Sequence, residues 1–84
     1  MKNKVLIYVY VPTLDSTYEI YIPTNESISV IIELIEKVIE GLSDNLFDSS
    51  AKHCLFDPDT SMVYSEKNIV RDTNIRNSKQ LILV

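Results

Sequence analysis

Two stretches near the start of the chain have the apolar pattern of β-strands. Lys4–Val11 is rich in β-branched and aromatic residues and is followed by Pro12. In Tyr18–Ile22, which is followed by Pro23, Tyr18, Ile20 and Ile22 alternate with Glu19 and Tyr21. Because proline cannot donate to a strand's hydrogen-bond ladder, each proline marks the end of a strand. Turn residues fill the segment between the two stretches, so the pattern predicts a β-hairpin with a loop of roughly six residues.

The apolar period then changes to that of an α-helix. The residues spaced three and four apart are Ile28, Ile31, Ile32, Ile35, Val38, Ile39 and Leu42. This spacing places them on one face of a helix. Ser27 is the expected N-cap, because its hydroxyl can accept a hydrogen bond from an unpaired backbone N–H. Gly41, the one glycine in the sequence, suits a left-handed residue at the C-terminal cap.

The second half of the chain reads as short strands and turns. A loop over residues 43–52 has an apolar anchor in Leu46 or Phe47, and short strands follow at 53–56, 62–65 and 79–84. The irregular segment between the last two strands is expected to contain one short helical turn. A closing strand that lies parallel beside the first, with the helix across one face, makes a mixed sheet of four to five strands. The sequence therefore predicts the α+β class.

The face of this sheet away from the helix is the candidate functional surface. The helix is expected to take the β-branched side of the first strand, which leaves tyrosines and aliphatic residues on the other side. The third strand adds either Leu55 or the pair Cys54 and Phe56, because its phase is ambiguous. With Leu55, the predicted partner-binding set is Leu6, Tyr8, Tyr10, Tyr21, Leu55, Ile82 and Val84. Such a surface is typical of a protein contact; the alternative is that these are simply good strand residues.

Length and charge restrict the classes of function that the chain can have. The 84 residues suit one domain over 1–84. The net charge of −4 and the scattered basic residues argue against nucleic-acid binding, which needs a basic stripe. No apolar run approaches the ~20 residues that span a bilayer, and a single cysteine excludes an internal disulfide. We therefore expect a cytoplasmic protein without direct membrane insertion.

One stretch, CLFDPDTS, matches a phosphohydrolase pattern in which Asp57 would be the nucleophile and Asp59 the general acid. Such enzymes need a doubly wound domain that is much longer than this chain. Turn chemistry explains the same residues, since Pro58 presets φ and Asp57 can bond its own backbone. A calcium loop with Ser61 would lack the glycine and the distal glutamate that it needs.

The single histidine and the single cysteine are adjacent, at His53 and Cys54. Neighbouring residues on a strand point to opposite faces, so the two cannot hold one metal, and we expect one to be buried and the other exposed. No set of nucleophile, base and orienting group is visible in the sequence. The expectation is a protein that is not an enzyme and that needs no metal or cofactor.

The stretches that carry a family resemblance are YVYVP, YEIYIP, LFDPDTSMVY and NIVRDTNIRNSKQLILV. The last of them is similar to the final segment of ubiquitin-like folds, with an Asp, an Asn–Ile pair, a polar turn and alternating leucines. Together the stretches resemble the YukD/EsaB family, small ubiquitin-like proteins of Gram-positive bacteria associated with type VII (WXG100-protein) secretion. The resemblance covers nearly the whole chain and rests on element order and apolar spacing.

The resemblance implies a ubiquitin-like β-grasp fold and a non-conjugated adaptor or regulatory protein. Its implied partner is a cytoplasmic part of the secretion machinery, or a second copy in a homodimer. Ubiquitin and the related sulfur carriers act through a flexible Gly-Gly tail, whereas this sequence ends in Leu83 and Val84, so conjugation is not expected. The alternative is a β-grasp carrier or enzyme-associated module whose Gly-Gly tail lies beyond Val84.

Overall fold

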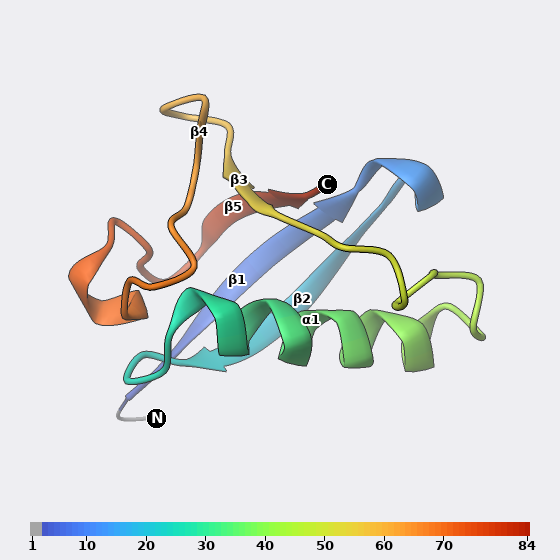
Figure 1. Cartoon of the computed structure of the whole chain (residues 1–84), viewed down its shortest axis with the longest axis horizontal. Helices are drawn as coiled ribbons and strands as arrows, with labels where there is room; N and C mark the ends of the chain where they lie inside the picture. The colour runs from blue at the N-terminus through green and yellow to red at the C-terminus, as the bar shows by residue number, and fades with distance from the viewer. Residues whose placement is uncertain (1–2) are drawn as a thin grey trace.

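A five-stranded sheet and one helix make up residues 3–84, the part of the chain that this computed structural model describes (Figure 1). The elements in chain order are β1 (Lys4–Val11), η1 (Pro12–Leu14), β2 (Ser16–Pro23), α1 (Ile28–Leu42), β3 (Leu55–Asp57), β4 (Met62–Val63), η2 (Val70–Asp72) and β5 (Lys79–Leu83). The predicted α+β class, with a mixed sheet and one helix packed on one face, is confirmed.

The first and last strands lie side by side at the centre of the sheet. The strand order is β2-β1-β5-β3-β4. Strands β1 and β2 form the predicted antiparallel hairpin, while β5 runs parallel to β1 with Ile7 opposite Lys79. Figure 1 shows the red closing strand beside the blue opening strand, as the sequence predicted. The β1–β2 loop is shorter than expected, and β2 already begins at Ser16. The short helix η1 and the left-handed Asp15, with φ of 46°, reverse the chain direction within residues 12–15.

The helix begins where its cap was predicted. The backbone N–H of Val30 donates to the Ser27 hydroxyl, with an N–Oγ distance of 3.3 Å. The prediction for Gly41 is wrong: it lies inside the last turn, and the helix continues to Leu42. Asp44 and Asn45 instead adopt the left-handed conformation after the helix, with φ of 53° and 65°. Short polar side chains tolerate that conformation, so a glycine is not required there.

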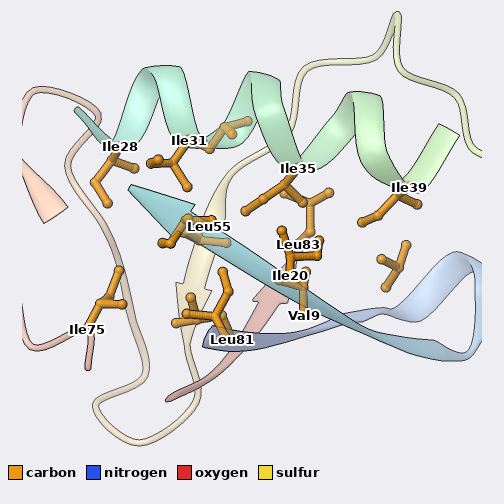
Figure 2. Packing of buried hydrophobic residues seen from close by; sticks show 14 of the residues in the cluster. Val9, Ile20, Ile28, Ile31, Ile35, Ile39, Leu55, Ile75, Leu81 and Leu83 are labelled. Atoms are coloured by element: carbon orange, nitrogen blue, oxygen red, sulfur yellow. The ribbon is translucent and has the colours of Figure 1, made fainter. Parts of the chain in front are cut away.

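Five isoleucines on α1 face the sheet and are buried: Ile28, Ile31, Ile32, Ile35 and Ile39. Figure 2 shows the labelled members pointing toward Val9, Ile20, Leu81 and Leu83 of the strands. Leu42, the last member of the predicted stripe, is exposed. In the loop after the helix the apolar anchor is Phe47, which is buried, and not Leu46, which is 78% exposed.

Candidate functional site

The sheet face opposite α1 carries the side chains that alternate with the core. On β1, the buried residues Ile7 and Val9 alternate with the half-buried Leu6, Tyr8 and Tyr10. The strand register therefore turns the alternation of β1 into rows of side chains across the sheet.

One such row crosses all five strands, and we call it the transverse row: Thr17, Tyr10, Ile82, Phe56 and Val63. Each neighbouring pair in it is a pair of register partners on adjacent strands. Four of its five members are aromatic or aliphatic, so the row forms an apolar band across the face that α1 leaves uncovered.

Leu55 does not belong to this face, so its inclusion in the predicted patch is wrong. It is fully buried opposite Leu83 and lies between the helix and the sheet (Figure 2). Phe56, one residue later, pairs with Ile82 and occupies the open face. The sequence left the choice open because Cys54, Leu55 and Phe56 are all apolar. No polar residue among them marks which side meets solvent.

A groove of ≈ 380 Å³ lies on the open face beside the transverse row. Its lining side chains include Tyr8, Tyr10, Thr17, Pro58, Gln80 and Ile82. The hydroxyl of Tyr10 donates to Oδ1 of Asp15 over 2.7 Å, which fixes the ring at one side of the groove. This hydrogen bond to the carboxylate, followed by burial and the negative charge of Asp15, raises the pKa of Tyr10.

The predicted patch is divided rather than continuous. Tyr8, Tyr10 and Ile82 line the groove, whereas Leu6 and Tyr21 line a separate hollow of ≈ 350 Å³ with Lys4, Asn77 and Ser78. Val84 is exposed, and its backbone pairs with Cys54 through two hydrogen bonds at the end of the sheet. The groove therefore gathers three residues of the predicted set, Tyr8, Tyr10 and Ile82, from the neighbouring strands β1 and β5.

A buried polar cluster lies where the CLFDPDTS turn meets β5. Asp57 is 2% exposed. Its Oδ1 accepts from the Asp59 backbone N–H at 2.9 Å, which is the predicted turn bond, and lies 2.9 Å from Nζ of Lys79. Its Oδ2 accepts from Nδ2 of Asn74 at 2.7 Å, and the Tyr64 hydroxyl donates to the Asn74 amide oxygen at 2.6 Å. Every oxygen of this carboxylate is therefore hydrogen-bonded within the fold.

The electrostatics of the cluster hold its charges in place. Burial alone would raise the pKa of Asp57, but the hydrogen bonds from Asn74, Lys79 and Asp59 outweigh it and hold that pKa well below its usual range. The carboxylates of Asp59 and Asp57 raise the pKa of Lys79. Burial, followed by the charge of Asp57, raises the pKa of Tyr64 to about 12. None of these groups is poised to exchange a proton near neutral pH.

His53 and Cys54 are both half-buried, so the expectation of one buried and one exposed residue is wrong. Both precede β3, whose first residue is Leu55, and strand alternation does not govern them. His53 Nδ1 lies 2.6 Å from Oε2 of Glu36, and its ring stacks on Phe47 with centroids 4.7 Å apart. These contacts attach the loop after α1 to the helix.

Across residues 3–84, no three side chains of the metal-binding types come together in a way that could hold an ion. Over the same residues, α1 is too short and too polar to cross a bilayer, and no other helix qualifies.

Comparisons with known proteins identify the fold. No family model and no curated protein matches the chain. Among solved structures, it is similar to the ubiquitin-like domain of an Arabidopsis thaliana protein, with 11% identity over 98% of this chain and 77% of that one and a TM-score of 0.70. It is also similar to a chain of the MycP5-free ESX-5 inner membrane complex, with 10% identity, 98% and 21% coverage and a TM-score of 0.72.

A third similar structure is a chain of the toluene 4 monooxygenase HD complex, with 6% identity, 95% coverage of each chain and a TM-score of 0.73. At these identities the likeness concerns the fold alone. The chain has a ubiquitin-like fold, as the sequence predicted, and domains of this fold occur in other proteins as parts of larger assemblies.

Proposed function

We propose that this domain is a ubiquitin-like adaptor or regulatory module that acts through non-covalent protein contacts and has no catalytic activity. The observation that carries the proposal is the groove beside the transverse row, where Tyr8, Tyr10 and Ile82 meet. Tyrosine gives a large contact area at a low cost in side-chain entropy, and it is enriched where interfaces are most strongly bound. One helix covers only one face of the sheet, so this apolar band remains available to a partner.

The state of the polar cluster supports a role without catalysis. Asp57 and Asp59, the residues of the phosphohydrolase-like pattern, both contact Lys79. A nucleophilic carboxylate must reach its substrate with a free oxygen, but both oxygens of Asp57 are engaged and the side chain is buried. The cluster is accounted for by its structural role in joining the β3–β4 turn to β5.

We extend the proposal to a cytoplasmic role in a type VII secretion system. The element order and apolar spacing resemble the YukD/EsaB family, and a chain of the ESX-5 inner membrane complex contains a domain of the same fold. In this setting the partner is a cytoplasmic part of the secretion machinery that docks on the open face. A second copy of this chain is the competing occupant of the same face.

The test is affinity capture from cells that encode the protein, with identification of captured proteins by mass spectrometry. Tyr10→Glu is the groove variant, and Leu46→Glu is the matched control because Leu46 is apolar, 78% exposed and outside the sheet face. We expect the wild type and Leu46→Glu to retain the same component of the secretion machinery and Tyr10→Glu to lose it. Secretion by the system should fail in cells that carry Tyr10→Glu.

Two results would overturn the proposal. Equal capture by Tyr10→Glu and the wild type would show that the open face is not the contact surface. Normal secretion in cells that lack the gene would separate the protein from that system. Sedimentation of the purified domain tests whether a second copy binds the open face instead. A wild-type dimer that Tyr10→Glu dissociates would show that it does.

A further inference from the structure

The groove on the open face is bordered by acidic side chains. Glu19 on β2 is exposed and is the register partner of Tyr8, which lines the groove. Side chains of directly opposed residues on antiparallel strands lie about 5 Å apart at Cβ, so this carboxylate stands at the groove's β2 side. Asp15 also lies beside the groove, because its Oδ1 accepts a hydrogen bond from the hydroxyl of Tyr10, which lines the groove.

The opposite side of the groove is lined by Pro58 of the β3–β4 turn. The next residue, Asp59, has a side chain that is 76% exposed, but it does not line the groove. Lys79 is the cation that contacts Asp59, with an Nζ–Oδ2 distance of 2.6 Å, but it is shared with the buried Asp57. Asp59 is therefore paired with Lys79 on the core side of the sheet, and the carboxylates that border the groove lie on its β2 side.

One wall of the groove is held in place before any partner arrives. The Tyr10 ring is fixed by its 2.7 Å hydrogen bond to Asp15, and Asp15 is itself set in the tight β1–β2 turn. A side chain that is already ordered loses little rotamer freedom on binding. The groove therefore offers a preformed apolar floor with two carboxylates, those of Glu19 and Asp15, on its β2 side.

We infer that the groove binds an apolar side chain of a protein partner that is flanked by lysine or arginine. The inference rests on the proposed function and adds the chemistry of the partner. The apolar side chain would lie between Tyr8, Tyr10 and Ile82, and its basic neighbours would meet Glu19 and Asp15. Complementary charge of this kind increases the rate of encounter and excludes partners with acidic flanks.

The same charges argue against a second copy as the occupant. Each chain carries a net charge of −4, so two open faces brought together would add to the negative charge around Glu19 and Asp15. Like charges that face each other across an interface are costly. A basic segment of another protein satisfies these carboxylates, whereas a second copy does not.

The experiment uses three synthetic peptides with one Leu-Ile-Leu centre and flanks of Lys and Arg, of Gln, or of Glu and Asp. Each is titrated into the isotope-labelled domain and followed by NMR chemical shifts. We expect the backbone amides of Tyr10, Thr17 and Ile82 to shift with the basic peptide. Its Kd should be at least about tenfold lower than that of the acidic peptide, and the difference should shrink as salt is added.

Two variants that each remove one negative charge show whether a carboxylate beside the groove or the net charge of the domain attracts the basic peptide. Glu19→Gln should weaken the basic peptide about threefold or more, while Glu33→Gln should leave its Kd unchanged, because Glu33 is exposed on α1 and lies outside the groove. Chemical shift changes at the groove that are equal for all three peptides would overturn the inference about charge but would still agree with a docking surface on the open face. Absence of shifts at the groove with every peptide would also overturn it, while the proposed function itself stands or falls with capture by Tyr10→Glu.

Discussion

Asp57 and Lys79 form a buried ion pair across two neighbouring strands, with 2.9 Å between Oδ1 and Nζ. Asp57 ends β3 and Lys79 begins β5. Their side chains are 2% and 12% exposed, and Asn74 completes the bonding of the carboxylate. The pair joins the end of β3 to the start of β5, so the β3–β4 turn depends for its anchorage on a residue 22 positions after Asp57.

Replacing one member of this pair should destabilise the domain. Asp57→Asn is expected to lower the free energy of unfolding by about 2–4 kcal/mol, because it leaves a lysine near-buried with only Asp59 to balance its charge. Asp72→Asn, an exposed carboxylate outside the cluster, is the control and should change it by less than about 0.5 kcal/mol. Urea denaturation at neutral pH measures both values.

The stability that Asp57 contributes should depend on pH. The pKa of Asp57 is lower in the folded chain than in the unfolded one. Its contribution to stability is therefore present above the unfolded pKa, near 4, and is lost as the pH falls toward the folded value. The stability difference between the wild type and Asp57→Asn should shrink as the pH is lowered from about 5 to about 2. A difference that stays constant over that range would contradict the assigned ionisation of Asp57.

Local patterns in the sequence predicted some features of this fold and could not predict others. The bounds of β1 and the start of α1 follow from dense local signals, namely β-branched residues before Pro12 and isoleucines at helical spacing after Ser27. The polar cluster joins residues 57, 64, 74 and 79, which are distant in sequence. Strand register brings these residues together, and a one-residue change of register moves a side chain to the other face.

The isoleucine stripe should account for much of the stability. Ile31→Ala and Ile35→Ala are each expected to lower the free energy of unfolding by about 2–5 kcal/mol, because each leaves a cavity under α1. Both side chains are fully buried. Leu42→Ala is the control: Leu42 is 62% exposed, and its loss should cost less than about 0.5 kcal/mol. Chemical denaturation gives the three values, and similar midpoints for all of them would contradict the helix packing.

The corrected phase of β3 leads to a separate prediction. Leu55→Ala should lower the free energy of unfolding by about 2–5 kcal/mol, since Leu55 packs between α1 and the sheet. Phe56→Ala removes a larger side chain but should cost less than half as much, because Phe56 is on the open face and keeps contact with solvent. Thermal melting followed by circular dichroism ranks the two variants. A larger loss for Phe56→Ala would place that aromatic ring in the core.

The assignment of the two faces of β1 can be tested with one pair of neighbours. Val9 is fully buried beneath α1 opposite Leu81, whereas Tyr10 lies on the groove side opposite Ile82. Val9→Glu should unfold the domain, because a carboxylate at that position would be buried without a partner. Tyr10→Glu should remain folded and lose partner binding, since its side chain already meets solvent on the open face that we propose as the docking surface. Circular dichroism melting together with capture of the partner measures both effects. The opposite ranking of stability would exchange the two faces and turn the proposed groove into the core of the protein.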